Sequence, residues 1–238
     1  MGLRSLISFL TIIPLGRGSL DEAARSLYLA PIIGLLEGLI VAGALVVLDG
    51  IYQPPATAAI ALLLHLILTG GLHMDGFTDY VEAVAARARG EEAERIIKDP
   101  RKGGFAIAYT TAMIIVRYAL LLEAVNEPWL VAAAYTAAAE AMYVYIYASK
   151  GRGSGLAAAF KESTLGNKPL ANLAIYTIAL IPAIAAGVNP LVYAAPILGI
   201  VVARDSTYRL GRPSGDAAGF SYETTLTLAL AVGVPIAT

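Results

Sequence analysis

The chain has 238 residues, of which 58% are hydrophobic and only 15% are charged. Soluble domains carry about 25% charged residues, so this composition is typical of a membrane protein. The 17 basic and 18 acidic residues nearly cancel, which excludes nucleic-acid binding driven by bulk positive charge and excludes a disordered acidic chain. The absence of cysteine excludes disulfides and thiolate chemistry, and two histidines are too few for a multi-histidine metal site.

Seven apolar stretches follow an apolar segment at residues 3–15, which we interpret as interfacial or re-entrant. They cover residues 30–48, 56–72, 105–125, 129–148, 170–186, 191–203 and 222–236. A helix needs about 20 apolar residues to cross a bilayer, so the last two stretches span only if tilted and are otherwise broken or buried in a bundle. We predict one domain over residues 1–238, an all-α polytopic integral membrane bundle of six to seven transmembrane helices.

The basic residues predict the orientation of this bundle. Sixteen of the 17 lie on alternate connections, whereas the connections near residues 49–55, 126–128 and 187–190 contain no Lys or Arg. The positive-inside rule then places the amino terminus and the charged connections in the cytoplasm, with the protein in the cell membrane. Three charges lie near the middle of these stretches, namely Glu37, Arg117 and Glu140. They either line a polar cavity or form a structural pair of Arg117 with one of the glutamates.

A charged loop of about residues 73–104 is the main candidate site. Thirteen of the 35 charged residues lie between Asp75 and Lys102. The spacing of Asp75, Asp79 and Glu82 puts the three carboxylates on one face of a helix. Carboxylate oxygens suit Mg²⁺, which leaves coordination positions for phosphates, so the stripe predicts phosphoryl transfer at the membrane surface. The alternative is a solvated helix face.

Other polar residues extend the candidate site. The loop closes with Lys98, Asp99, Arg101, Lys102 and Gly103. These residues either hold phosphate oxygens, with Asp99 as a base or metal ligand, or form a basic cluster that anchors to anionic lipid. His73, at the loop's start, is either a general base or a structural residue. A second polar segment at 204–219 contributes Ser214 and Asp216 on the same expected side of the membrane, so the two segments are expected to converge.

Several of these motifs resemble those of the cobalamin synthase family, also called adenosylcobinamide-GDP ribazoletransferases. The run Gly-Gly-Leu-His-Met-Asp-Gly-Phe-Thr-Asp at residues 70–79 is similar to the family signature. The run Lys-Asp-Pro-Arg-Lys-Gly at 98–103 and the segment 206–219 are similar to two later motifs, and Phe-Leu-Thr-Ile-Ile-Pro at 9–14 and Pro-Ile-Ile-Gly at 31–34 match its amino-terminal part. The resemblance covers nearly the whole chain in order.

The resemblance implies a Mg²⁺-dependent membrane enzyme that joins adenosylcobinamide-GDP to α-ribazole or its 5′-phosphate and releases GMP. With the residue patterns, it implies the following roles: His73, Asp99 and Arg101 in catalysis; Lys98, Lys102, Gly103, Ser214 and Asp216 in substrate binding; and Asp75, Asp79 and Glu82 as metal ligands. The chain departs from the family where Glu82 replaces an Asp, Pro100 a Ser and Ser214 a Thr. Glu140 stands where an Arg is expected. A homo-oligomer is left open.

Two other functions remain open from the sequence. A membrane phosphotransferase of the CDP-alcohol type also carries carboxylates at four-residue spacing, but its Asp-Gly-x-x-Ala-Arg run is not matched after Asp75-Gly76. A transporter would use Glu37, Arg117 and Glu140 as its polar core, but would not need the carboxylate stripe outside the bilayer.

Overall fold

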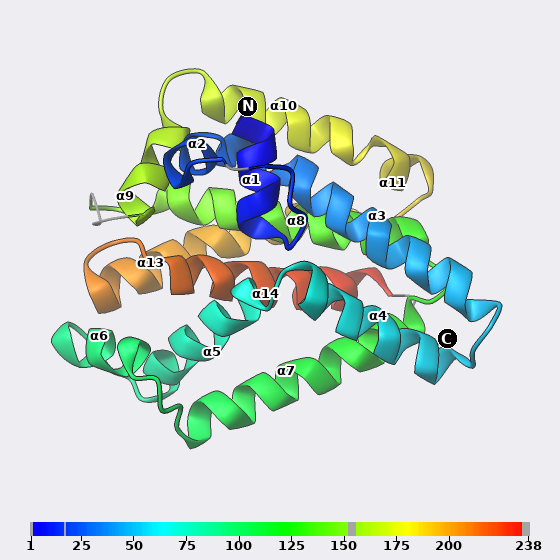
Figure 1. Cartoon of the computed structure of the whole chain (residues 1–238), viewed down its shortest axis with the longest axis horizontal. Coiled ribbons are helices and arrows are strands. Elements are labelled where there is room, and N and C mark those ends of the chain that lie inside the picture. Colours follow the sequence, from blue (N-terminus) through cyan, green and yellow to red (C-terminus); the bar gives the residue numbers. More distant parts are fainter. Residues whose placement is uncertain (1, 17, 152–155, 235–238) are drawn as a thin grey trace.

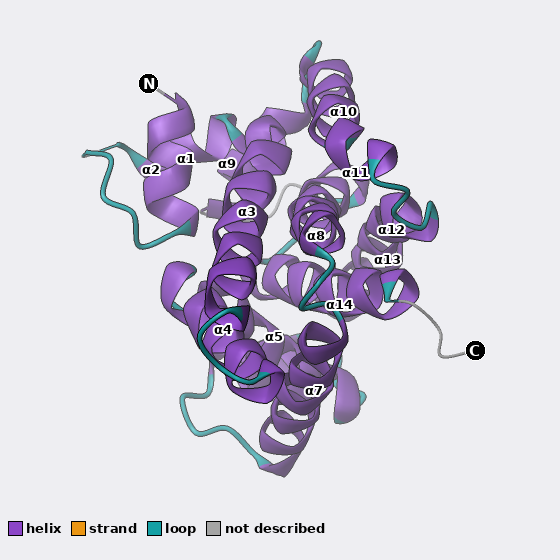
Figure 2. Ribbon diagram, turned by 90° about the vertical axis from the view of Figure 1, so that its right-hand side faces the viewer, coloured by secondary structure: helices purple, strands orange, loops and turns teal. Residues whose placement is uncertain are grey.

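A computed structural model describes residues 2–16, 18–151 and 156–234, and that part of the chain is helical without strands (Figures 1 and 2). The α-helices are α1 (Gly2–Leu10), α2 (Leu20–Arg25), α3 (Ala30–Asp49), α4 (Pro54–Leu68), α5 (Leu72–Ala85), α6 (Glu91–Lys98), α7 (Gly104–Glu123), α8 (Pro128–Ala148), α9 (Leu156–Lys161), α10 (Lys168–Ala179), α11 (Ile181–Ala185), α12 (Leu191–Ala194), α13 (Leu198–Leu210) and α14 (Gly215–Gly233). Short 3₁₀ turns lie at Leu27–Leu29, Glu162–Thr164 and Ala195–Ile197. The all-α prediction is confirmed.

Helix α8 is the centre of the bundle and packs against α3, α13 and α14. In its most apolar stretch 89% of the residues are buried, compared with 17% in α7. Glycines bring α3 against it, because a Cβ atom at Gly34 would lie 2.4 Å from the Tyr135 carbonyl oxygen and one at Gly38 2.8 Å from the Ala132 Cα. Small residues let two membrane helices approach closely, which accounts for the spacing of these two glycines.

The described helices include four that are long and apolar enough to cross a membrane, at Leu27–Asp49, Gly104–Glu123, Pro128–Ala148 and Lys168–Ala185. A fifth is the bent pair α4–α5, if it counts as one span. The expected six to seven spans are therefore not confirmed. The stretch at 191–203 is broken into α12, a 3₁₀ turn and the start of α13. Of the stretch at 222–236, residues 235 and 236 lie outside the described part, as do Arg17 and Arg152 from the basic set.

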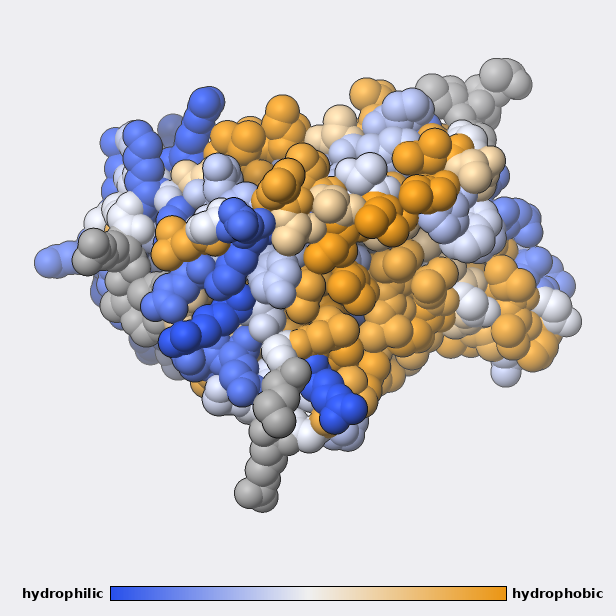
Figure 3. Space-filling model, turned by 90° about the horizontal axis from the view of Figure 1, so that it is seen from above, coloured by the Kyte–Doolittle hydropathy of each residue, from blue (hydrophilic) through white to orange (hydrophobic). Residues whose placement is uncertain are grey.

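The surface has the distribution expected of a membrane protein. Large apolar side chains are exposed along α3, α7 and α10, for example Val47, Ile107, Ile115, Leu170 and Ile178. Figure 3 shows a broad apolar area between hydrophilic ends of the molecule. Exposed side chains of this kind would be costly in water over so large an area, whereas lipid accommodates them.

The chain turns sharply between α4 and α5. The two helices are bent by 89° at Gly70 and Gly71, whose φ angles are +59° and +71°. These values lie in the left-handed region, which glycine adopts without steric cost. The two glycines of the signature run therefore set the direction in which α5 carries its acidic residues.

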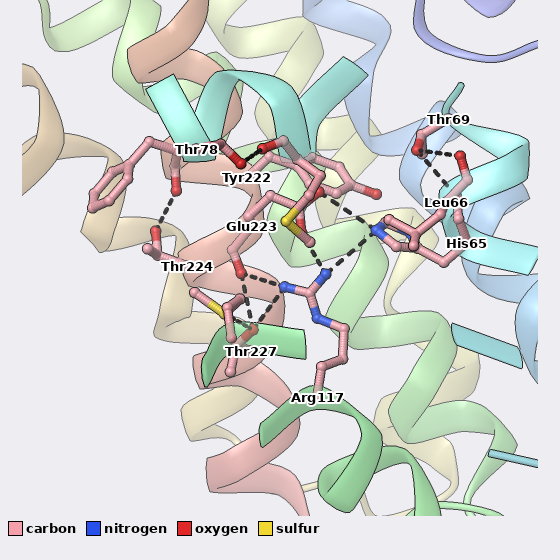
Figure 4. A network of polar contacts seen from close by, with 12 residues as sticks. His65, Leu66, Thr69, Thr78, Arg117, Tyr222, Glu223, Thr224 and Thr227 are labelled. Carbon is pink, nitrogen blue, oxygen red and sulfur yellow. Dashed lines mark hydrogen bonds and ion pairs between the residues drawn. The ribbon is translucent and has the colours of Figure 1, made fainter. Parts of the chain in front are cut away.

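The charges within the bundle pair differently from the prediction. Arg117 of α7 pairs with Glu223 of α14, and not with Glu37 or Glu140. Its guanidinium also donates to the Glu223 carbonyl oxygen at 2.8 Å and to Thr227 Oγ1 at 2.7 Å, and it lies 3.3 Å from His65 Nε2 (Figure 4). All three side chains of the Arg117–Glu223–His65 cluster are buried. This cluster joins α4, α7 and α14 in the interior.

The other two charges are bound separately. Glu37 accepts a hydrogen bond from the Tyr222 hydroxyl. Glu140 accepts one from Asn172 Nδ2 at 3.0 Å, and the same amide donates to the Tyr28 carbonyl oxygen at 3.1 Å. The three charges singled out in the sequence therefore do not form a common polar core.

Candidate active site

The site forms where α5 crosses α14. A Cβ atom at Gly76 would lie 3.1 Å from the Asp216 Cα, and one at Gly219 would lie 2.8 Å from the His73 carbonyl oxygen. Side chains at either glycine would push the helices apart. The glycines of the two motifs therefore bring Asp216 beside the acidic face of α5, and the two polar segments converge as predicted.

A cavity of about 170 Å³ opens at this crossing. Its polar lining includes His73 and Asp75 from α5 and Ser214 and Asp216 from the start of α14. Its remaining wall is apolar and comes mainly from α1, α8 and α9. We call this the crossing pocket. Four of the predicted site residues meet there.

His73 is the most enclosed of these residues. Its side chain is buried and its ring stacks on Tyr222, with ring centroids 4.0 Å apart. Its Nε2 atom is buried and has no hydrogen-bond partner among the described residues. A buried polar atom without a partner is costly, so a substrate group that bonded to it would be favoured.

A second cavity, of about 140 Å³, lies farther along α5. It is lined by Glu82, Arg95, Ile96, Asp99 and Arg101, and we call it the loop pocket. It shares no lining residue with the crossing pocket. The acidic stripe of α5 thus runs from Asp75 in one pocket to Glu82 in the other.

The residues of the loop pocket are engaged with one another. Glu82 Oε1 accepts a hydrogen bond from the Gly103 amide at 2.7 Å. Arg101 donates to Asp99 from its backbone amide at 2.9 Å and from its guanidinium at 3.2 Å. These hydrogen bonds lower the pKa of the Asp99 carboxyl below its ordinary value. Arg101 itself is largely exposed.

Asp79 lies on α5 between Asp75 and Glu82, and it forms an ion pair with Lys102. Lys102 Nζ lies 2.9 Å from Asp79 Oδ1 and also donates to the Ile97 carbonyl oxygen at 3.1 Å. Lys98, by contrast, pairs with Glu94 of its own helix at 3.5 Å and is 71% exposed. Of the two predicted lysines, only Lys102 contacts the acidic stripe.

The donor set suits a hard cation, although the described side chains do not form a closed metal cage. Burial first, and then the negative charges of Asp79 and Asp75, raise the pKa of Asp216. A cation among these carboxylates would relieve that repulsion. Within residues 2–16, 18–151 and 156–234, no three Asp, Glu or His side chains converge at metal-binding distances.

Hydrogen bonds around Asp205 and Tyr145, which the sequence did not assign to the site, hold the site in place. Asp205 of α13 accepts hydrogen bonds from Tyr80 at 2.7 Å and from Arg209 at 2.8 Å, which joins α13 to α5. The buried Tyr145 hydroxyl lies 3.0 Å from Ser206 Oγ and accepts from the Ser214 amide at 2.8 Å. The Ser214 hydroxyl caps α14 by accepting from the Ala217 amide at 3.1 Å.

The chain was compared with known proteins. The profile of a family described as CobS, cobalamin-5-phosphate synthase, matches residues 2–234. A protein of Clostridium perfringens (strain SM101 / Type A) named adenosylcobinamide-GDP ribazoletransferase is 31% identical over 225 residues, which cover 90% of this chain and 89% of that protein. A protein of Stutzerimonas stutzeri (strain A1501) with the same name is 30% identical over 240 residues, covering 95% and 97%.

No solved structure matches the chain. The profile extends over both the run that begins at Gly70 and the segment that ends at Gly219, the two parts of the sequence that meet at the crossing pocket. The chain belongs to the CobS family of cobalamin-5-phosphate synthases.

Proposed function

We propose that the chain is an adenosylcobinamide-GDP ribazoletransferase. It joins adenosylcobinamide-GDP to α-ribazole or its 5′-phosphate and releases GMP, so the product is adenosylcobalamin or its 5′-phosphate. Family membership supports the reaction. The observation that carries it in this chain is the meeting of His73, Asp75 and Asp216 in one pocket, because phosphoryl transfer needs a base and anchored carboxylates at one place.

The reaction exchanges one oxygen–phosphorus bond for another. A ribose hydroxyl oxygen of the ribazole forms a bond to the phosphorus attached to the cobinamide. The bond from this phosphorus to GMP breaks, and the hydroxyl proton passes to a base of the protein. His73 fits this task better than Asp99, since it lines the pocket that also holds Asp75 and Asp216, whereas Asp99 lies in the other pocket bonded to Arg101.

The acidic stripe is the proposed place for Mg²⁺. Asp75 and Asp79 are the ligands expected from the sequence, and Asp216 lies across the helix crossing, where its charge and theirs act on one another. The three carboxylates would have to draw together, and Lys102 would have to leave Asp79, for one ion to bind all three. Glu82 accepts a hydrogen bond from the Gly103 amide, so in this structure its carboxylate fixes the end of the loop. A Mg²⁺ ion bound there would neutralise the negative charge of the diphosphate and of the departing phosphate group.

The basic residues of the loop are proposed to hold phosphate oxygens. Arg101 presents an exposed guanidinium at the rim of the loop pocket, where Arg95 also lies. Guanidinium groups bind phosphates through paired hydrogen bonds. Lys102 pairs with Asp79 of the acidic stripe and follows Arg101 in the chain. We place the diphosphate along this edge of α5.

The proposed location is the cell membrane, with the two pockets facing the cytoplasm. The apolar helices support a membrane location. The orientation follows from the basic residues, because Arg95, Lys98, Arg101 and Lys102 all lie beside the site and positive loops stay on the cytoplasmic side. Both substrates and GMP would then meet the enzyme from the cytoplasm or the adjoining bilayer.

The decisive experiment incubates the purified protein in detergent with adenosylcobinamide-GDP, α-ribazole and Mg²⁺. We expect a cobalamin product and one GMP per product molecule, and loss of both when Asp75→Asn replaces the native protein or EDTA removes the cation. A protein that forms no cobalamin at saturating substrates, but transfers another phosphoalcohol or transports a solute into proteoliposomes, would contradict the proposal. Near-normal turnover of Asp75→Asn would contradict only the metal assignment.

A further inference from the structure

The crossing pocket has two chemically different walls. Helices α5 and α14 provide the polar wall described above. The opposite wall is formed by Phe9 of α1, Leu27, Met142 and Ile146 of α8, and Phe160 of α9. The rings of Phe9 and Phe160 lie with centroids 5.5 Å apart at an interplanar angle of 44°. A ligand that fills this pocket is therefore apolar and flat at one end and polar at the other.

The size of the pocket limits what can enter it. Pockets that hold a whole drug-sized ligand measure roughly 300–1,000 Å³, and this one measures about 170 Å³. A corrin macrocycle is larger than such a ligand, so the corrinoid substrate cannot fit inside. A ligand portion no larger than one bicyclic aromatic ring with part of a ribose can fit a cavity of about 170 Å³.

The chemistry of the lining distinguishes between the remaining candidates. Among the residues that the structure describes, the ionisable side chains that line the crossing pocket are Asp75, Asp216 and His73, without a Lys or Arg. Phe9, Met142 and Phe160 offer no hydrogen bond to the polar edges of a guanine ring, and the phosphates of the guanosine diphosphate moiety fit the cation proposed beside the acidic stripe. The loop pocket, which holds Arg95 and Arg101, is the better place for phosphates. An uncharged aromatic base suits the crossing pocket.

We infer that Phe9, Met142 and Phe160 form the subsite for the aromatic base of the ribazole substrate, and that they thereby determine which base the enzyme accepts. The inference rests on the proposed function. α-Ribazole is a ribose joined to dimethylbenzimidazole, so a base lying between the apolar side chains directs its ribose towards His73 and Asp216. The reacting hydroxyl then lies next to the proposed base, and the corrinoid approaches from outside the pocket.

The test measures the two substrates separately. For Phe9→Leu, Phe160→Leu and Met142→Phe, we expect the KM for α-ribazole to rise about tenfold, while the KM for adenosylcobinamide-GDP changes less than twofold. Tyr109→Leu is the control, because Tyr109 is an exposed aromatic residue of α7 outside the pocket lining, and it should change neither KM. Phe9 is only partly buried, so Phe9→Leu carries little risk to folding.

A binding measurement separates this inference from the proposed function. Calorimetric titration of the purified protein with α-ribazole, and with dimethylbenzimidazole alone, should show about tenfold weaker binding to the same three variants. If the native protein forms no cobalamin but the variants still weaken binding, the proposed function fails and the subsite stands. If cobalamin forms and the variants change neither KM nor binding of α-ribazole, the subsite is wrong. An equal rise in both KM values also overturns it.

Discussion

His73 and Asp99 are both candidates for the proton acceptor, and their surroundings predict different effects of mutation. Asp99 lines the loop pocket and is engaged by hydrogen bonds from Arg101. His73 lines the crossing pocket together with Asp75 and Asp216. A positioned base contributes about 10²–10⁴-fold to a rate. We expect His73→Gln to lower kcat by that factor and Asp99→Asn to lower it less than tenfold, measured as GMP release at saturating substrates.

The pH profile provides the control for this comparison. In the native protein kcat should fall as pH drops, because protonation removes the base, and His73→Gln should flatten this limb while Asp99→Asn keeps it. A flattened limb in Asp99→Asn with an unchanged one in His73→Gln would reverse the assignment.

The Arg117–Glu223–His65 cluster is expected to stabilise the fold without taking part in transfer. Removing one partner of a buried ion pair leaves a charge without compensation and costs about 3–5 kcal/mol. We expect Glu223→Gln to lower the midpoint of thermal unfolding in detergent, while the fraction that stays folded keeps its KM values. Arg25→Ala is the control, since Arg25 forms an exposed pair with Asp21, and such pairs contribute about 1 kcal/mol or less.

A transporter would behave differently. If Arg117 and Glu223 lay on a solute path, their variants would change uptake into proteoliposomes without changing thermal stability. Unaltered unfolding of Glu223→Gln would therefore contradict the structural role of the cluster.

Single residues differed in how well the sequence predicted them. The motifs located His73, Asp75 and Asp216. Each motif also contains a glycine, Gly76 or Gly219, at the point where α5 and α14 cross. The partner of Arg117 was missed because Glu223 stands at the start of an apolar stretch. Helix α14 begins at Gly215, which places Glu223 about two turns inside it. The signal was present in the helix start, a Ser followed by Gly and Asp, which is a favourable N-cap pattern.

At the scale of helices, the close contact of α5 with α14 is the element on which the site depends. A Cβ atom at Gly219 would lie 2.8 Å from the His73 carbonyl oxygen, and a backbone atom cannot give way as a side chain can. We expect Gly219→Ala to move α14 away from α5 and to lower kcat by at least tenfold, measured as GMP release. Gly43→Ala is the matched control, because nothing lies within 4 Å of a Cβ atom there.

The control variant Gly43→Ala also has a predicted effect on stability. Alanine stabilises a helix interior by up to about 1 kcal/mol relative to glycine, so Gly43→Ala should raise the unfolding midpoint slightly and leave kcat unchanged. Equal activity of the two variants would show that the helix crossing tolerates a wider separation than the structure indicates.

Helices could be predicted from the sequence, but their continuity could not. Apolar runs of about 20 residues gave α3, α7 and α8 within a few positions. The run at 191–203 was expected to be tilted, broken or buried, and the structure shows it broken by a 3₁₀ turn at Ala195–Ile197. The sequence left these alternatives open, because a proline such as Pro196 interrupts a helix to a degree that depends on its neighbours. Hydropathy alone does not distinguish a span from a broken helix buried in the bundle.

At the scale of the whole molecule, the orientation in the membrane can be tested directly because the chain contains no cysteine. Lys98→Cys lies beside the loop pocket and Gln53→Cys in the connection between α3 and α4, and both positions are exposed. We expect a membrane-impermeant maleimide to label Gln53→Cys in intact cells, and Lys98→Cys only after the membrane is opened. The expected contrast follows from the basic residues near Lys98.

The native chain without cysteine is the blank for this labelling, and Gln53→Cys, which lies away from both pockets, should retain GMP release. Labelling of Lys98→Cys in intact cells would place the site outside and contradict the proposed cytoplasmic orientation. Labelling of both residues in intact cells would show that they lie on the same side, which the alternation of basic connections does not allow.

The 89° bend between α4 and α5 has a consequence for the level at which each carboxylate lies. In a straight continuation of α4, the seven residues from Asp75 to Glu82 would descend or rise by about 10 Å along the axis of α4. The bend turns that length perpendicular to α4. Asp75, Asp79 and Glu82 therefore lie at nearly one level along the axis of α4, so one substrate group lying across the end of α4 can reach all three.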